Sequence, residues 1–268
     1  MNTERKMAKN MRINALEAVS KAGASHIGAV LSVTDIVATL YADVMKYDAN
    51  NPKSATRDVF ILSKGHAGCA LYCALAEVGF FPKSDLENYY TYGSLLSGHV
   101  SHKVPGVEVT TGALGHGLGI GVGFAYSFKL DKKSNRVFVV VGDGECNEGS
   151  IWESVMLAVQ LKLDNLFIIV DRNNMQAMGR CEDIIDMGDL AKKFAAFGCN
   201  TIEVNGHDHE QLKEAFKIKR DNRPIVVIAN TIKGKGVSFM ESNILWHYRN
   251  PSAEDLKKAI AEIEASHA

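Results

Sequence analysis

The sequence has few cysteines, few prolines and almost no excess charge. Its five cysteines, in 268 residues, include no Cys-x-x-Cys pair and no regular spacing, which argues against a disulfide framework and against a cysteine zinc site. Lysine and arginine (30) nearly balance aspartate and glutamate (31), so the charge favours neither a nucleic-acid partner nor an anionic membrane surface. Uninterrupted apolar runs are too short to span a bilayer, and none follows the basic N-terminal residues. We therefore expect a cytoplasmic protein that does not cross a membrane.

Internal repeats and low-complexity linkers are also missing, so we expect residues 1–268 to form a single domain. Short apolar, β-branched runs alternate with longer amphipathic stretches, which predicts an α/β fold with a parallel sheet and helices on both faces. The predicted strands are residues 59–62, 137–141, 166–170, 201–204 and 225–229. The predicted helices are residues 8–21, 33–45, 67–78, 117–130, 153–161, 209–219 and 253–268.

Two polar loops follow the second and third predicted strands. Gly142-Asp143-Gly144 ends the second strand, and Asn173 comes 30 residues after Asp143, at the end of the third. Ligands of parallel sheets bind beyond the carboxyl ends of the strands, so Asp143, Asn173 and the carbonyl of Met175 are candidate ligands of a hard cation such as Mg²⁺. The two glycines would let the backbone approach a diphosphate. Alone, Gly-Asp-Gly also fits a simple turn. The asparagine at this spacing favours a metal-binding function for the two loops, which together are called the metal loop.

This spacing is similar to the thiamine-diphosphate motif, and other segments extend the likeness. The matching segments are 24–28 (ASHIG), 62–67 (LSKGHA), 105–112 (PGVEVTTG), 142–149 (GDGECNEG) and 231–236 (TIKGKG), the last followed by Trp246-His247. Together they resemble the transketolase family over essentially the whole chain. The resemblance implies the thiamine-diphosphate-binding fold, of the diphosphate-binding type, with thiamine diphosphate and Mg²⁺ or Ca²⁺ as cofactors.

The resemblance also implies which residues touch the cofactor. Gly112 and Leu114 would offer backbone groups to its aminopyrimidine, and Glu148 and Glu153 match glutamates of a proton-linked network across a subunit interface. The cofactor-binding residues expected from the family are His66, Gly112, Leu114, Gly142, Asp143, Gly144, Glu148, Glu153, Asn173, Lys233 and His247, with Asp143, Asn173 and Met175 as metal ligands.

Five residues are expected to be catalytic on the same grounds: His26, His66, His99, His247 and Glu148. His26 and His99 would contact the donor sugar, while His66, Lys233 and His247 would approach the diphosphate or the reacting carbons. Histidine suits proton transfer to and from sugar hydroxyls because its ordinary pKa is close to 6.5.

The family further implies a partner. Transketolases continue through a pyrimidine-binding domain and a C-terminal domain, neither of which is found in residues 1–268. We therefore expect the N-terminal subunit of a two-chain transketolase, active only with a C-terminal partner subunit in a heterotetramer. The assembled enzyme would transfer a two-carbon ketol unit from a ketose phosphate to an aldose phosphate. The helix with Trp152 and Met156 is expected to contribute to the interface.

Three alternatives stay open at this point. The chain would also fit a transketolase that acts on a modified sugar, or the α subunit of another thiamine-dependent enzyme such as a 2-oxo-acid dehydrogenase. From a different class, it would fit a noncatalytic subunit that retains the fold, although such a subunit would be expected to have lost its metal ligands.

Overall fold

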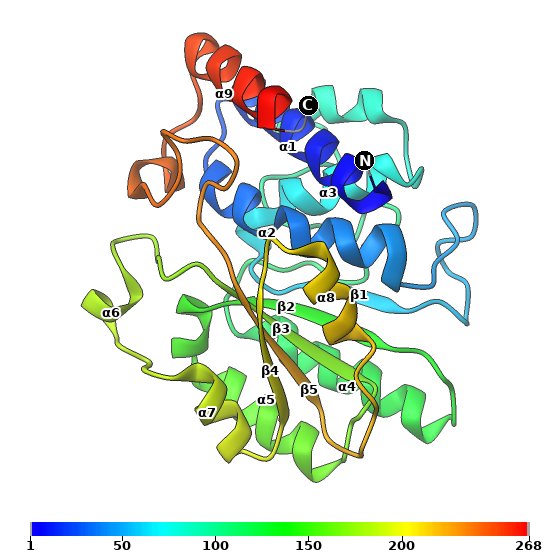
Figure 1. The fold of residues 1–268 in the computed structure, drawn as a ribbon. Coiled ribbons are helices and arrows are strands. Elements are labelled where there is room, and N and C mark those ends of the chain that lie inside the picture. Colours follow the sequence, from blue (N-terminus) through cyan, green and yellow to red (C-terminus); the bar gives the residue numbers. More distant parts are fainter. Residues whose placement is uncertain (1, 267–268) are drawn as a thin grey trace.

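A computed structural model describes residues 2–266 and has a five-stranded, fully parallel sheet at its centre (Figure 1). The strand order is β1-β2-β3-β5-β4. The strands are β1 (Val59–Leu62), β2 (Val137–Gly142), β3 (Leu166–Arg172), β4 (Asn200–Asn205) and β5 (Ile225–Asn230). All five predicted strands are confirmed to within two residues at either end, as is the parallel sheet.

The strands form where they were predicted because nearly every side chain in the central ones is apolar and buried. Successive strand residues point to opposite faces of a sheet, and here Phe138 and Phe167 pack in one apolar cluster while Val139 and Ile168 pack in another. Both faces therefore need a helical cover, as is usual for parallel sheets.

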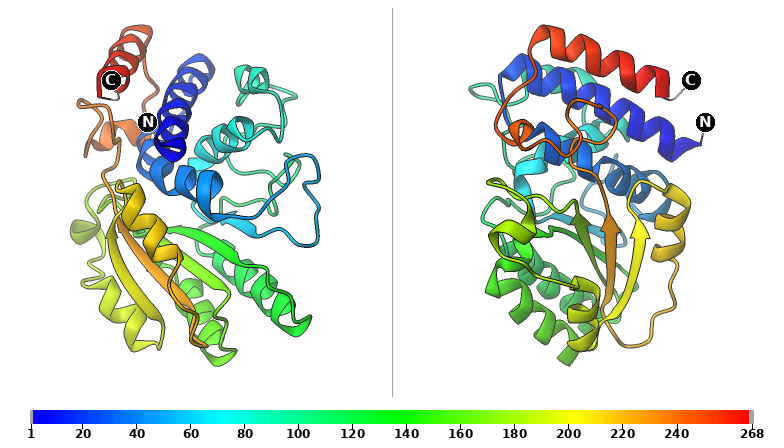
Figure 2. Two further views of the ribbon diagram at one scale, coloured as in Figure 1. Left: turned by 45° about the vertical axis from the view of Figure 1, so that its right-hand side comes forward. Right: turned by 60° about the vertical axis from the view of Figure 1, so that its left-hand side comes forward.

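Two groups of helices provide that cover, one on each side of the sheet (Figure 2). Helices α1, α2, α3, α8 and α9 share the cluster of Phe138, and α4, α5 and α7 share the cluster of Val139. The helices are α1 (Thr3–Ala22), α2 (Ile27–Thr39), α3 (Gly68–Glu77), α4 (His116–Leu130), α5 (Gly149–Gln160), α6 (Cys181–Ile184), α7 (Leu190–Ala196), α8 (His209–Phe216) and α9 (Ala253–Ser266).

The main departure from the predicted helices lies at α2. The helix begins at Ile27 instead of residue 33 and continues as a π-helix, Leu40–Val44. By length and composition Ile27–Val44 is apolar enough to cross a membrane, with a mean hydropathy of 1.6, yet 83% of it is buried inside the protein. This stretch was not singled out from the sequence, because only uninterrupted apolar runs were considered and Ser32, Thr34 and Asp35 interrupt this one.

Smaller differences concern the short helices and the chain ends. Helices α6 and α7 were not predicted, since four and seven residues are too few to show a helical period. The predicted tail helix is present as α9, and residues 267–268 of that prediction, like residue 1 of the predicted domain, lie outside the described residues.

The sheet brings four loops to one edge. In the parallel register, Gly142 of β2 pairs with Asp171 of β3, and Asp171 pairs with Ala229 of β5. The loops that follow β1, β2, β3 and β5 therefore start side by side, at residues 63, 143, 173 and 231. The chemistry expected from the sequence must be sought there, beyond the carboxyl ends of the strands.

Candidate active site

A cavity of about 290 Å³ opens at this edge of the sheet. It is lined by His26, Ala29, Lys64, His66, His99, Gly112, Leu114, Gly142, Asp143, Gly144, Glu145, Asn173, Met175, Gln176, Ala177, Lys233 and His247. The structure thus gathers all but two of the predicted site residues around one space, although they are spread over more than two hundred positions of the sequence. The two that it leaves outside are Glu148 and Glu153.

Asp143 joins the loop after β2 to the loop after β3. Its Oδ1 accepts a hydrogen bond from the N–H of Gly144 at 2.7 Å, and its Oδ2 accepts one from the N–H of Asn174 at 2.5 Å. Asn174 reaches this position because it adopts a left-handed backbone, with φ of 60°, which asparagine tolerates better than most residues. The turn therefore sets Asp143 and Asn173 beside the same cavity.

Hydrogen bonds also decide which way the Asn173 amide points. The hydroxyl of Ser32 donates to Asp171 at 2.7 Å, so its oxygen is free to accept from Nδ2 of Asn173 at 3.1 Å. Because Nδ2 donates to Ser32, Oδ1 of Asn173 accepts from the N–H of Met175 at 3.1 Å, beside the cavity that Asn173 lines. An amide oxygen held in this way suits a hard cation.

The charge on Asp143 calls for a positive partner. Burial, together with the neighbouring carboxylate of Asp171, raises the pKa of Asp143 to about 6, and within residues 2–266 Asp143 makes no ion pair with a lysine or arginine. A bound cation would stabilise its charged form. The described part of the chain contains no cluster of three or more His, Cys, Asp or Glu side chains able to hold a metal, so the remaining ligands would be the Met175 carbonyl, water and ligand oxygens. That division is typical of Mg²⁺ beside a diphosphate.

Four histidines surround the space above this loop. The ring centroid of His26 lies 5.4 Å from that of His66, 5.8 Å from His99 and 4.9 Å from His247. The backbone joins two of these segments, because the N–H of His26 donates to the carbonyl of His247 at 2.9 Å. His26 itself has a positive φ of 73°, a conformation that is uncommon for residues other than glycine.

Burial and neighbouring positive charge keep the rings of His26 and His247 neutral. Burial, then the nearby His99 and Lys233, lowers the pKa of His26 to about 4; burial, then Lys233, lowers that of His247 to about 3. Neutral imidazoles can accept as well as donate protons. The Nδ1 atom of His247 is buried without a hydrogen-bond partner among the described residues, so it is available to a ligand.

Known proteins resemble this chain in sequence and in fold. The family described as "Transketolase, thiamine diphosphate binding domain" matches residues 3–261. This chain belongs to the transketolase family. It is 42% identical over 254 residues to one of the subunits of the apulose-4-phosphate transketolase of Phocaeicola vulgatus, covering 94% of this chain and 90% of that protein. It is 38% identical to the SqwG subunit of the 6-deoxy-6-sulfo-D-fructose transketolase of a Clostridium species, covering 96% and 94%.

A solved transketolase has the same fold. The crystal structure of transketolase from Campylobacter jejuni superposes with a TM-score of 0.92 at 31% sequence identity. The match covers 98% of this chain and 43% of the Campylobacter jejuni chain. The chain therefore spans less than half the length of that transketolase, whereas it spans nearly all of the two relatives named above.

Three buried charges in this transketolase-family site were not predicted. Lys64 and Asp171 form an ion pair, Nζ to Oδ2 at 2.5 Å, that is almost fully buried. Burial would raise the pKa of Asp171, but Lys64 and hydroxyl donors lower it overall. Glu145 accepts from the hydroxyl of Ser63 and the N–H groups of Gly115 and Gly142, at 2.5, 2.8 and 2.9 Å. The sequence signal that could have identified Lys64, Asp171 and Glu145 is that each lies at or just after the end of an apolar strand.

Glu148 and Glu153 lie on the surface near the start of α5 and do not line the cavity. The first residues of α5 do not line the cavity either, whereas Gly144 does. A Cβ at residue 144 would come within 2.7 Å of Cγ of Gln176, so any larger residue there would displace that side chain. Trp152, on the helix expected at the interface, is half-buried and packs against Phe194 and Phe197.

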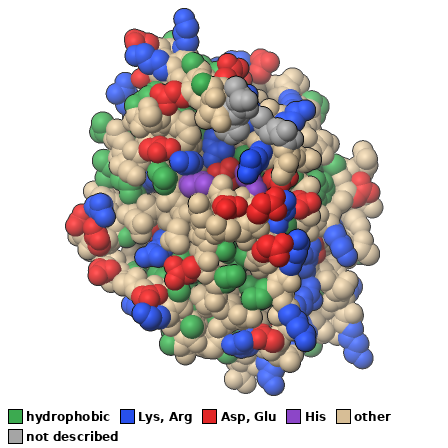
Figure 3. All heavy atoms as spheres, in the orientation of Figure 1, with side chains coloured by type: hydrophobic (Ala, Val, Ile, Leu, Met, Phe, Trp, Pro, Cys, Tyr) green, Lys and Arg blue, Asp and Glu red, His purple; other side chains and the backbone are tan. Residues whose placement is uncertain are grey.

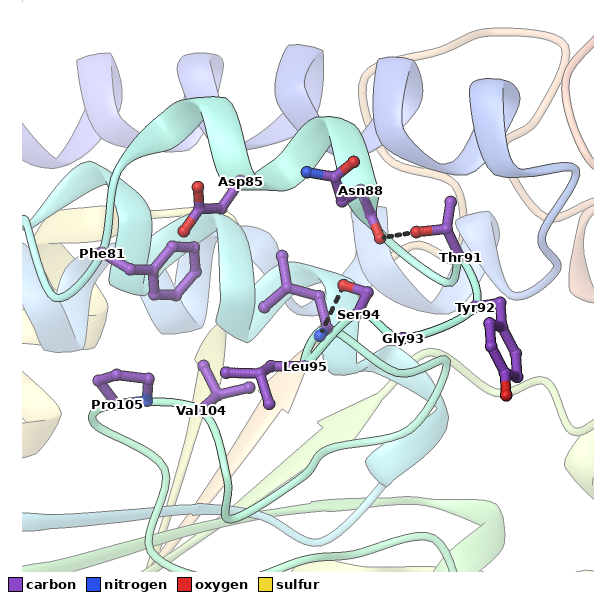
Figure 4. A pocket seen from close by; sticks show the side chains of 11 residues that line it. Phe81, Asp85, Asn88, Thr91, Tyr92, Gly93, Ser94, Leu95, Val104 and Pro105 are labelled. Carbon is purple, nitrogen blue, oxygen red and sulfur yellow. Dashed lines mark hydrogen bonds between the residues drawn. The ribbon is translucent and has the colours of Figure 1, made fainter.

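A second cavity, of about 430 Å³, lies along the segment Lys83–Asn88 (Figure 4). Its walls carry Phe81, Leu95, Val104 and Pro105, and Asp85 is the one acidic or basic side chain among the residues that line it. No histidine or lysine is among these lining residues, so the cavity lacks the proton-transfer groups that the first cavity offers.

Proposed function

We propose that this chain binds thiamine diphosphate with a divalent cation and acts as the N-terminal subunit of a two-chain transketolase. The assembled enzyme transfers a two-carbon ketol unit from a ketose phosphate to an aldose phosphate. The observation that carries the proposal is the pair of oxygens from Asp143 and Asn173, held at one cavity that four histidines also line. The names of the relatives, which describe them as subunits, support the two-chain organisation.

Thiamine diphosphate supplies the carbanion chemistry that breaks and remakes the carbon–carbon bond. Asp143, Asn173 and the Met175 carbonyl would hold Mg²⁺ or Ca²⁺, and Lys233 and His247 would face the diphosphate. Burial and the nearby Lys64 lower the pKa of Lys233 to about 8, so an anionic group beside it would favour its charged form. Gly112 and Leu114 line the same cavity and would offer backbone groups to the aminopyrimidine.

The histidines would move protons on the sugar. His99 is exposed at the mouth of the cavity, whereas His66 and His247 lie deeper. His26 and His99 would therefore meet the donor sugar first, where an imidazole can take a proton from a hydroxyl and return it. The buried walls also limit the access of water to the reacting carbons.

The partner subunit would cover α4 and α5. These helices pack on each other, and Ile120, Met156 and Leu157 leave large apolar groups exposed on them. Leu114 is both exposed and part of the cavity lining, so a chain that covers this surface would also close the cavity. Glu148 directly precedes the first residue of α5 and would belong to the proton-linked network across the interface.

Two copies of each chain would form a heterotetramer, which we place in the cytoplasm. The isolated chain should show no transketolase activity. Adding a second chain that carries the pyrimidine and C-terminal domains, identified by copurification, should restore it. Activity with a 2-oxo acid but not with a ketose phosphate would refute the assignment, as would full activity of the isolated chain.

A modified sugar is a second candidate for the substrate. Two relatives that this chain matches over nearly their whole length are named for apulose 4-phosphate and for 6-deoxy-6-sulfo-D-fructose. A panel of branched, sulfonated and ordinary ketose donors, compared by kcat/KM, distinguishes the candidates. His99→Ala should reduce kcat/KM for the preferred donor more than it weakens cofactor binding.

A further inference from the structure

Asp35 of α2 organises a cluster of side chains outside the cofactor cavity. Its carboxylate accepts hydrogen bonds from Arg12 at 2.9 and 2.6 Å and pairs with Nδ1 of His207 at 2.7 Å, and Nε2 of His209 lies 3.4 Å away. Burial acts to raise the pKa of Asp35, but these neighbours hold it well below its usual value. The cluster lines a hollow on the face where histidine side chains are visible in Figure 3.

The hydrogen bonds of His207 fix the position of its ring proton. The backbone N–H of Ile232 donates to Nε2 of His207 at 2.8 Å. A ring nitrogen that accepts from an N–H group carries no proton of its own, so the proton lies on Nδ1 and is donated to Asp35. His207 is therefore a neutral bridge from a buried carboxylate to one backbone N–H group.

That N–H group belongs to the residue directly before Lys233. On the other side of Lys233, the Nε of Arg12 donates to the carbonyl of Lys235 at 3.1 Å. The segment is thus held one residue before and two residues after Lys233, and both bonds lead back to Asp35. Between the two anchor points, the Lys233 side chain enters the cofactor cavity and is 2% exposed.

The position of the Lys233 ammonium depends on this backbone. Its Nζ donates to the carbonyl of Gln176 at 3.0 Å, at the end of the metal loop. Gly28 packs against its stem: a Cβ at residue 28 would lie 3.3 Å from Cγ of Lys233. Little free space remains, so a small shift of the backbone at residue 232 would displace the ammonium from its place beside the diphosphate site.

We propose that His207 and Asp35 are positioning residues for Lys233: they hold the backbone at residues 232–235 so that the ammonium is aimed at the cofactor diphosphate. The inference rests on the proposed function, because it requires thiamine diphosphate in the cavity. Lys233 contacts the ligand, and His207 acts only through Lys233.

The test compares His207→Phe with His209→Phe in the assembled two-chain complex. Both variants remove an imidazole from the same carboxylate and keep a ring of similar size, but only the first loses the bond to Ile232. Binding of thiamine diphosphate with Mg²⁺ is measured by calorimetry. We expect about tenfold weaker binding for His207→Phe, which is typical when a residue that orients a ligand-contacting side chain is replaced. For His209→Phe we expect a change of less than about twofold.

Two further variants show whether the effect passes through Lys233. In a Lys233→Met background, His207→Phe should cause no additional loss of affinity, since the group it positions is already gone. His207→Gln should recover most of the affinity, because its amide can accept from the N–H at residue 232 and donate to Asp35.

Equal losses in the two phenylalanine variants, or additive losses in the double variant, would overturn the inference. If His207→Phe fails to assemble, His207→Asn replaces it, because asparagine is too short to reach both Asp35 and the N–H at residue 232. Weak binding of thiamine diphosphate by His207→Asn together with strong binding by His207→Gln supports the inference. Equal binding by the two variants overturns it. A wild-type complex that binds no thiamine diphosphate overturns the proposed function as well, which separates the two failures.

Discussion

Asp143 has both of its oxygens committed to backbone N–H groups and still borders the cavity. Its negative charge is therefore the property that a cation would use, and Asp143→Asn removes this charge with little change in shape. We expect Mg²⁺-dependent binding of thiamine diphosphate to weaken by at least about tenfold. Calorimetry of the assembled complex measures this, with Asp131→Asn, an exposed carboxylate on a distant loop, as the control. Unchanged affinity would contradict the metal site.

His26 and His247 predict how stability depends on pH. Their pKa values in the folded cofactor-free protein, about 4 and about 3, lie below the value near 6.5 of the unfolded chain. The unfolded state therefore takes up protons first, and the free energy of unfolding should fall as the pH decreases from about 6.5 to about 4. Replacing both residues with glutamine should flatten this dependence in urea denaturation at several pH values. An unaltered pH dependence of the unfolding free energy would show that the pKa values of the two rings are not lowered in the folded protein.

At the scale of elements, α4 and α5 combine exposed apolar groups with a role in the core. Met156 is 53% exposed, so Met156→Asp should leave the fold of this chain intact while placing a charge in the proposed interface. We expect loss of copurification with the partner and a Tm of the isolated chain within a few degrees of the original. Ile185→Asp, at an apolar residue of similar exposure (55%) that lies outside α4 and α5, is the control. Assembly that survives Met156→Asp would place the interface elsewhere.

The whole molecule should be stabilised by its cofactor. A ligand that binds only the folded state contributes about 2.7 kcal/mol at 100 times its Kd. Thiamine diphosphate with Mg²⁺ should therefore raise the Tm of the complex, and a chelator should reverse the rise. The cavity includes Leu114 at an exposed edge, so the isolated chain should gain less. An equal gain for both would mean that the partner contributes nothing to binding.

Much of the fold could be predicted because its signals are local. A parallel strand buried on both faces appears in the sequence as a continuous apolar run, and β1, β2, β3 and β5 do so. The strand β4, which was also predicted to be buried, lies at the edge of the sheet and is mostly half-exposed, and its polar and apolar residues alternate. The start of α2 was missed because the residues from Ile27 to residue 33 are apolar without a helical period, as expected for a helix buried on every side.

The sequence by itself determined which residues follow the ends of the strands, because strand length and the turn residues Gly142 and Asn174 are set by neighbours in the chain. It thereby placed Asp143 and Asn173 at one edge of the sheet. Only the tertiary structure decided that Lys64 pairs with Asp171, that Glu148 stays outside the cavity, and that His207 reaches the backbone before Lys233. Such pairs are separated by 25 to 107 residues, and their distances depend on how helices pack on the sheet, which no local pattern of residues specifies.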